Sequence, residues 1–359
     1  MSGKTVIQGF ISKEWTLLNY KVVAPPFQKQ YFSGTIDCLY LVWHDPMVGY
    51  GSYYLLFRSI AMFKNLNPSL LGISGHQSEI IELALTHGFS GIDLNIADLA
   101  TRVRLKGLPY ARRLIDSAKI RIGTFQLPVD WDADDESFNR DLKKLPEYAD
   151  VAVAIGCTRC IATLSPAGDK RPYHENFEFH RRRFQEIAAI FKAAGVHLAL
   201  GFQAAEYLRR NQAFQFIHDI DALTLLLNMI DSPNVGLLLD IWDVFASGGS
   251  FDSIRKIPKH QILAVQIAEL PAQVPLAELD EKSRLLPNAE NGRIRVASIL
   301  SYLADVSYDG PVTVKPCRAA FPSRRRDAVV KLTGESLDKV WSNAGLPTPA
   351  SYFTAVAQY

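Results

Sequence analysis

The stretch Asn234-Val235-Gly236-Leu237-Leu238-Leu239-Asp240-Ile241-Trp242-Asp243 contains an apolar run of strand length that ends in acidic residues. A continuous apolar run indicates a strand that is buried on both faces, as strands of parallel sheets are. In parallel α/β proteins, the functional groups gather at the carboxyl ends of the strands. Asp240 is therefore the first candidate functional residue of this chain.

Strand and helix patterns alternate from Pro68 onward, on both sides of this stretch. The expected strands are 70–74, 91–95, 120–126, 160–164, 196–202, 235–241, 262–268 and 311–315. The expected helices are 79–87, 108–118, 136–155, 177–194, 222–230, 251–256, 296–305 and 326–344. No G-x-G-x-x-G follows the first strand, which disfavours a doubly wound sheet. Eight strand–helix units without hairpin signals predict an α/β fold, a (β/α)8 TIM barrel.

The predicted domain organisation has three parts. Residues 1–67 are aromatic-rich and irregular, so we expect an N-terminal extension outside the barrel that is poorly ordered. A peripheral hairpin and a start codon assigned too far upstream are equally open readings. The barrel is expected over residues 68–345, and residues 346–359 form a C-terminal tail.

Composition excludes several functional classes. The 359 residues carry a formal net charge of +2 and are 48% hydrophobic, which gives no basic footprint for nucleic acid or a membrane surface. Four cysteines are too few for a disulfide framework, so we expect a cytoplasmic protein. Cys157 and Cys160 have C-x-x-C spacing but lack the second pair or histidines of a zinc site. Homo-oligomerisation stays open.

Four pieces of sequence, taken together, resemble a known family. They are 87–94 (HGFSGIDL), 194–200 (AGVHLAL), 235–240 (VGLLLD) and 308–314 (YDGPVTV). Their order and spacing resemble the sugar-phosphate isomerase/epimerase family, the xylose-isomerase-like TIM barrels, over residues 68–345. This resemblance implies a barrel whose site lies at the carboxyl ends of the strands.

The resemblance also implies a divalent metal held by four side chains. The family's pattern has a Glu after strand 5, an Asp after strand 6, a His on strand 7 and a Glu on strand 8. The corresponding positions here are Gly201, Asp240, Gln266 and Lys315. Asp240 is the only ligand position that survives, because glycine offers no ligand and a lysine ammonium has no lone pair.

Lys315 places a positive charge where the cation would lie, and it would balance Asp240 without a metal. We therefore expect no cofactor. The alternative is a relocated site for Mn, Mg or Zn that uses Asp240, Asp243, Glu269 and Glu206.

Several residues carry more than one reading. Asp240 is either a site residue or half of a structural ion pair with Lys315. Lys315 either balances charge or forms a Schiff base with a carbonyl substrate. With these two as the catalytic candidates, the expected substrate-binding residues are Gln266, Arg284, Glu269, Asp243, Trp242 and His174.

The resemblance implies proton transfer on a small, sugar-like polyhydroxylated carbonyl compound. The chain is therefore expected to act on or bind such a ligand with a degraded metal site. The alternative is a catalytically inactive barrel kept as a ligand-binding or scaffolding protein. A third hypothesis, the apurinic-site endonuclease branch, needs a cluster of histidines and carboxylates that these strand ends do not supply.

Overall fold

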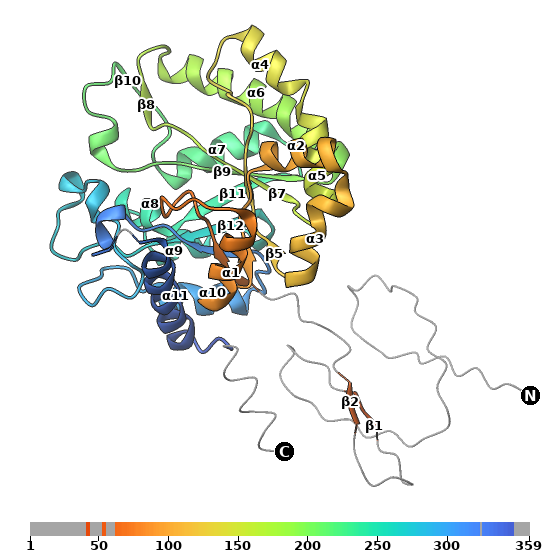
Figure 1. Ribbon diagram of the computed structural model, residues 1–359. Helices are drawn as coiled ribbons and strands as arrows, with labels where there is room; N and C mark the ends of the chain where they lie inside the picture. The colour runs from red at the N-terminus through yellow and green to blue at the C-terminus, as the bar shows by residue number, and fades with distance from the viewer. Residues whose placement is uncertain (1–40, 44–51, 55–61, 324, 348–359) are drawn as a thin grey trace, which may run out of the picture. The chain divides into compact units, whose positions relative to one another are not determined.

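A computed structural model describes residues 41–43, 52–54, 62–323 and 325–347 (Figure 1). The chain divides into two compact units between Ile60 and Ala61. In the first unit, β1 (Leu41–Trp43) pairs antiparallel with β2 (Ser52–Tyr54). Most of the predicted extension, and with it the expectation of poor order, lies outside the described residues.

The second unit contains a parallel sheet that closes on itself. Its order is β5-β4-β3-β13-β12-β11-β9-β7-β6. Only Gly123 and Thr124 separate β5 from β6, so these two are halves of one strand that pair with opposite neighbours. The ring therefore closes as an eight-stranded barrel, as expected. The strands are β3 (Phe63–Leu66), β4 (Gly91–Ile92), β5 (Arg121–Ile122), β6 (Phe125–Gln126), β7 (Arg159–Thr163), β9 (His197–Gly201), β11 (Val235–Asp240), β12 (Ile262–Ile267) and β13 (Pro311–Val314).

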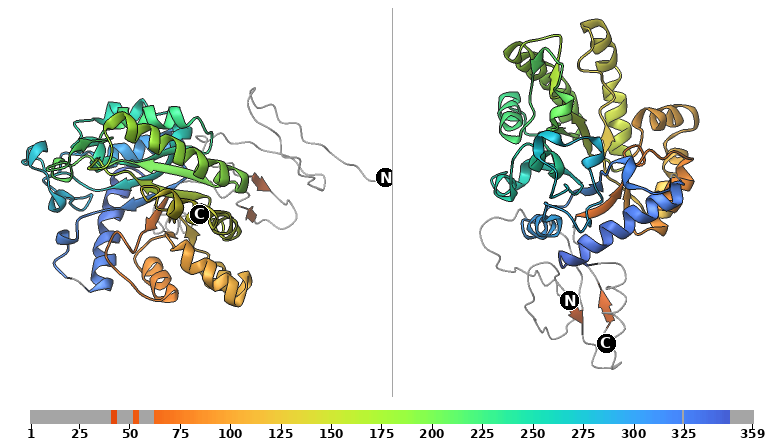
Figure 2. Two further views of the ribbon diagram at one scale, coloured as in Figure 1. Left: turned by 90° about the horizontal axis from the view of Figure 1, so that it is seen from above. Right: turned by 90° about the vertical axis from the view of Figure 1, so that its left-hand side faces the viewer.

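Helices surround this sheet on its outer side in both further views (Figure 2). They are α1 (Gln77–Thr86), α2 (Ile96–Lys106), α3 (Leu108–Ala118), α4 (Asp135–Leu142), α5 (Leu145–Ala154), α6 (Tyr173–Ala194), α7 (Ile220–Ile230), α8 (Ile241–Ala246), α9 (Phe251–Arg255), α10 (Val296–Asp305) and α11 (Arg326–Asn343). A small antiparallel pair, β8 (Ala167–Gly168) with β10 (Phe214–Gln215), joins the loops after β7 and β9. Within the described residues, no helix combines the length and the apolar character that a membrane crossing needs.

The prediction of the first strand at 70–74 is wrong. The strand that pairs with β13 and β4 is β3, and residues 68–72 form turns, with Gly72 at φ +61°. The apolar run misled the prediction because Leu71 is buried within a turn. The polar residues of β3 hid the real strand, which begins before the expected boundary at Pro68.

Other differences are smaller. The expected helix 136–155 is two helices, α4 and α5, which are separated at Lys143 and Lys144. The pattern analysis missed α2 and α8, which begin directly after Asn95 and Asp240. In both cases the side chain of the residue before the helix accepts hydrogen bonds from backbone N–H groups of the first turn.

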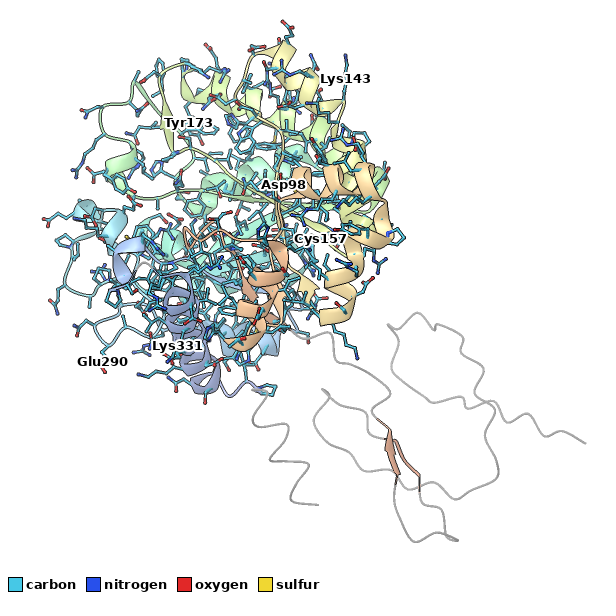
Figure 3. All side chains as sticks on the ribbon, in the orientation of Figure 1. Asp98, Lys143, Cys157, Tyr173, Glu290 and Lys331 are labelled. Carbon is cyan, nitrogen blue, oxygen red and sulfur yellow. The ribbon has the colours of Figure 1, made fainter. Side chains whose placement is uncertain are left out.

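Alternation along the strands decides which side chains reach the centre of the barrel. Ile161, Ala199, Leu238 and Ala264 form a separate cluster inside the barrel, while the outward residues pack against the helices. Side chains fill this interior and the space under the helices (Figure 3). Because strand side chains alternate, the residue two positions after each inward residue also points inward. That rule places Thr163, Gly201, Asp240 and Gln266 in the last inward layer, at the carboxyl mouth.

Candidate functional site

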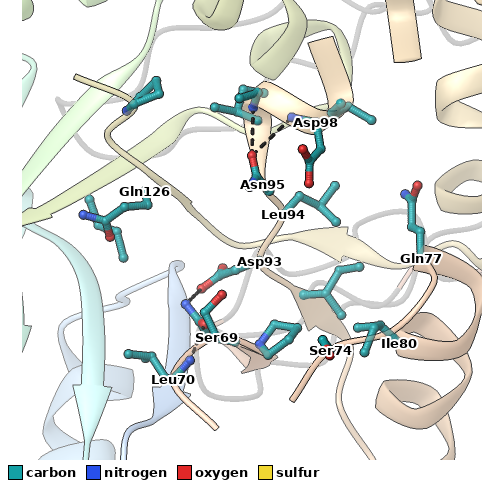
Figure 4. A pocket seen from close by; sticks show the side chains of 18 of the residues that line it. Ser69, Leu70, Ser74, Gln77, Ile80, Asp93, Leu94, Asn95, Asp98 and Gln126 are labelled. Carbon is teal, nitrogen blue, oxygen red and sulfur yellow. Dashed lines mark hydrogen bonds between the residues drawn. The ribbon is translucent and has the colours of Figure 1, made fainter. Parts of the chain in front are cut away.

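A cavity of about 680 Å³ opens at the carboxyl ends of the strands (Figure 4). Half of its polar lining residues come from strand ends on different sides of the barrel. These residues are Asn67, Asp93, Gln126, Thr163, Gln266 and Lys315. The N-terminal part of α2 and the segment before α1 complete the wall, with Asn95, Asp98, Gln77 and Ser74 among the lining residues. A volume of this size suits a small-molecule ligand.

An ion cluster lies beside this cavity, at the ends of β11 and β13. Lys315 Nζ donates to Asp240 Oδ2 at 2.8 Å, and Arg284 Nη1 lies 3.0 Å from the same oxygen. Asp240 also caps α8, because its Oδ1 accepts from the backbone N–H of Trp242 at 3.1 Å. The Asp240 side chain is only 4% exposed, so both cations compensate a buried carboxylate.

Arg284 joins a second carboxylate to this cluster. Its Nη2 donates to Asp243 Oδ2 at 2.5 Å, while Asp243 Oδ1 accepts from the Ala204 N–H at 2.9 Å. The guanidinium also lies 4.1 Å from the centre of the Trp242 ring, whose Nε1–H donates to the Ser283 carbonyl. Asp240, Asp243, Trp242 and Arg284 are thus brought together, but none of them lines the cavity.

The pKa values of the two carboxylates of the cluster are shifted in opposite directions. Burial alone would raise the pKa of Asp240, but Arg284 and Lys315 outweigh it and hold that pKa well below its ordinary value. Burial raises the pKa of Asp243, Arg284 lowers it, and the negative charge of Asp240 raises it again, so that this pKa is about 6. Asp240 is therefore ionised, and its negative charge is compensated by Lys315 and Arg284.

The donors at the four family positions do not suit a divalent cation. Asp240 is already paired with two cations, and Lys315 offers no lone pair. A Cβ atom at Gly201 would lie 3.1 Å from Leu238, so this position is closely packed rather than open. Among the described residues, no group of three or more His, Cys, Asp or Glu side chains is arranged to hold a metal ion.

The four residues of the suggested relocated site do not all come together, although Asp240 and Asp243 share Arg284. Glu269 Oε1 accepts from the backbone N–H groups of Leu270 and Ile294 at 2.9 and 2.6 Å, which fixes the loop that carries Arg284. Burial raises the pKa of Glu269 more than these hydrogen bonds lower it, and the resulting pKa is about 7. Glu206 instead pairs with Arg210. Glu269 thus serves the loop backbone rather than the cavity.

His174 lies near the start of α6 as an exposed side chain against the ring of Tyr173. It does not line the cavity. Gln266 and Lys315 are the two predicted site residues that do.

Sequence reasoning missed the half of the site formed by the first three strands. Asp93 lines the cavity and is 9% exposed, and Asn67 and Gln126 lie at the neighbouring strand ends. The available signal was weaker than for Asp240, because Asp93 is an acidic residue in the middle of the expected strand 91–95 and not at its end. It was overlooked because the expected metal drew attention to strands 5 to 8.

Parts of this chain are similar in sequence to known proteins. The 3-dehydroshikimate dehydratase of Pseudomonas aeruginosa is 23% identical over 248 residues, which are 68% of this chain and 37% of that protein. The inosose isomerase of Bacillus velezensis is 24% identical over 157 residues, 44% of this chain and 52% of that protein. The chain therefore spans about half or less of the length of these relatives.

Solved structures share the fold. A xylose isomerase domain protein from Alicyclobacillus acidocaldarius superposes with a TM-score of 0.70 at 23% identity, covering 79% of this chain and 100% of that one. The IOLI protein, described with a zinc atom bound, gives a TM-score of 0.64 at 18% identity, with 79% and 99% covered. The family model described as xylose isomerase-like TIM barrel matches residues 81–337, and the chain belongs to this family.

Proposed function

We propose that this barrel binds a small polyhydroxylated carbonyl compound in the cavity at its mouth, without a divalent ion. The observation that carries the proposal is the ion pair between Lys315 and buried Asp240, at positions where the family's pattern has two metal ligands. The ammonium supplies a positive charge to a ligand oxygen in the same region of the mouth. The names of the relatives, a dehydratase of dehydroshikimate and an isomerase of inosose, support this ligand class.

The rest of the cavity suits hydroxyl groups. Gln266 is 4% exposed, and its Oε1 has no hydrogen-bond partner within the described part of the chain. A buried acceptor without a partner costs about 1–3 kcal/mol, which a ligand hydroxyl would recover. Asn67, Gln126 and Thr163 add further polar groups around the cavity.

A binding measurement with chelated metal tests the proposal. The full chain would be treated with EDTA and titrated calorimetrically with 3-dehydroshikimate, an inosose and D-tagatose as probes. We expect at least one probe to bind, and Gln266→Leu to weaken it about tenfold or more, since a lost hydrogen bond of about 1.4 kcal/mol gives that factor. Gln261→Leu, in the 3₁₀ helix directly before the same strand, is the matched control and should bind as the wild type does.

Metal analysis gives the opposing outcome. Stoichiometric Mn, Co or Zn that is bound by purified protein and lost in Asp240→Ala would overturn the metal-free site. If the EDTA-treated wild type binds none of the probes, the ligand assignment is wrong. If a probe binds, borohydride trapping separates a Schiff base from an ion-paired lysine, and trapping that persists in Lys315→Ala would exclude Lys315 as the amine.

A barrel that binds without turnover is the second candidate. It is favoured by Asp240, the surviving family acid, because two cations and two backbone N–H groups already engage that carboxylate. Such a carboxylate is a poor acceptor for a substrate proton, so turnover requires another acid–base group.

A further inference from the structure

The cavity contains one carboxylate whose surroundings differ from those of Asp240. Asp93 Oδ1 accepts from Asn65 Nδ2 at 2.8 Å and from the Thr124 N–H at 2.6 Å. Its Oδ2 accepts from Asn67 Nδ2 at 2.7 Å. All of these donors are neutral, and no Lys, Arg or His side chain in the described residues forms an ion pair with Asp93. A carboxylate oxygen has about two lone-pair sites, so Oδ2 keeps one for a ligand.

The residues around Asp93 hold its carboxylate in one orientation. Asn65 also donates to Thr313 Oγ1 at 2.9 Å, which ties the group to β13. Glycine at position 123 makes this arrangement feasible, because a Cβ atom there would lie 2.3 Å from Asn65 Oδ1. In the view of Figure 4, Asp93 lies between Gln126 and Ile80 among the residues that line the cavity. The carboxylate is therefore fixed and faces the space that a ligand would fill.

Lys315 faces the same cavity from another strand end. Asp93 follows β4 and Lys315 follows β13, and β3 lies between these strands. Two strand spacings separate their backbones by about 10 Å. Both side chains line the cavity, so a compound of five or six carbons between them would contact both.

We propose that Asp93 is a catalytic residue, the carboxylate that removes a proton from the carbon beside the carbonyl of the bound compound. This inference rests on the proposed function. Asp93 Oδ2 takes the proton, the C–H electron pair becomes the C=C bond of an enolate, and the carbonyl π pair moves to oxygen. Lys315 donates a hydrogen bond to that oxygen, and the Asp93 carboxyl then returns the proton to carbon. The step consumes no oxidant or reductant.

The protonation of Asp93 agrees with this role. Burial raises its pKa more than the hydrogen bonds from Asn65, Thr124 and Asn67 lower it, and the resulting pKa is about 6. A general base works best when its pKa lies near the working pH. The other titratable or charged groups nearby are the buried thiol of Cys157 and, along the cavity wall, Asp98, Arg102 and Lys315.

Hydrogen exchange in D₂O tests the inference on the full chain. NMR would follow replacement of C–H by C–D beside the carbonyl in whichever of the inosose, D-tagatose and 3-dehydroshikimate probes binds. We expect exchange by the wild type and a loss of about 100-fold or more in Asp93→Asn, with probe binding retained. Asp150→Asn, an exposed carboxylate on α5 that does not line the cavity, is the control and should exchange at the wild-type rate.

Two readouts separate a catalytic role from a structural one. Formate should partly restore exchange to Asp93→Ala, because it supplies a carboxylate to the vacated space. Wild-type exchange should fall as the pH drops through about 6, and this step should disappear in Asp93→Asn.

Three results would overturn the inference. If a probe binds to the wild type but no proton exchanges, Asp93 has no such role and the binding proposal stands. If Asp93→Asn exchanges at the wild-type rate, another group is the base. If no probe binds, the proposed function fails and the inference falls with it.

Discussion

Asp240 and Asp93 lie at the ends of strands in the same barrel mouth, and their partners differ in charge. At the ends of β11 and β13, Asp240 is held by the cations of Arg284 and Lys315. At the end of β4, Asp93 is held by two amides and a backbone N–H. Opposite charges favour ionisation of the first acid, whereas burial with neutral donors disfavours ionisation of the second.

This contrast shows how one mouth can combine a fixed charge with an acid that titrates. In the half where the family's pattern places a metal, protein cations neutralise the carboxylate and fill the space around it. The other half contains most of the cavity lining and an acid, Asp93, that forms no ion pair with any residue the structure describes. We infer that charge stabilisation stays in the first half and that proton transfer belongs to the second.

The largest effect is expected from removing the shared cation of the ion cluster. Arg284→Met leaves Asp240 and Asp243 buried with Lys315 as the remaining cation of the cluster. Removing one partner of a buried ion pair costs about 3–5 kcal/mol, because a charge stays without compensation. Urea unfolding monitored by circular dichroism would measure this loss.

The control for this variant comes from the same loop. Arg295 is exposed, so Arg295→Met should change the free energy of unfolding by about 0.5 kcal/mol or less. Equal stability of the two variants would show that the cluster contributes no more than a surface charge does.

An intermediate effect is expected from the pH dependence of stability, with opposite signs at the two acids. The pKa of Asp93 is raised to about 6 in the folded protein, from an ordinary value of 3.8. The folded state then binds its proton more tightly, so the Asp93 contribution to stability falls as the pH rises from about 4 to 6. The pKa of Asp240 is lowered, so its contribution is present above 3.8 and is lost as the pH falls below that value.

Unfolding of three proteins across pH would measure these slopes. The stability of the wild type relative to Asp93→Asn should decrease between pH 4 and 6 by on the order of 1–3 kcal/mol. Relative to Asp240→Asn, it should decrease only when the pH is lowered below about 4. Slopes of the same sign in both comparisons would contradict the contrast between the two halves.

The smallest effect concerns the packing around Gly201 at the end of β9. A methyl group at Gly201 would lie 3.1 Å from Leu238 Cδ2, so the Leu238 side chain must shift by a few tenths of an ångström. Gly201→Ala should therefore destabilise the protein by about 1 kcal/mol, measured by thermal unfolding. Gly168→Ala places its methyl group in open space and should be nearly neutral. A stabilising Gly201→Ala would show instead that room for a longer side chain exists there.

The alternation of strands and helices predicted the barrel correctly because local periodicity reports which faces are buried. The prediction failed at β3, where Asn65 points into the barrel and interrupts the apolar pattern. Its hydrogen bonds to Thr313 and Asp93 connect residues that are 248 and 28 positions apart in sequence. Local patterns contain no information on such partners.

In the candidate site, too, some features could be predicted from the sequence and others could not. The resemblance and strand-end positions pointed to Asp240, Lys315 and Gln266, and the order of the strands brings the first two together. That Arg284 would engage both Asp240 and Asp243, rather than face a ligand, depends on a loop that returns over the mouth.

The amino-acid sequence by itself determined the barrel and the residue types at the strand ends, because burial periodicity and side-chain chemistry are local properties. Only the tertiary structure decided which acid is neutralised by cations and which faces the cavity among neutral donors. The reason is physical: the protonation of a buried carboxylate depends on the charges and dipoles within a few ångströms, and closure of the barrel brings those groups from distant parts of the chain.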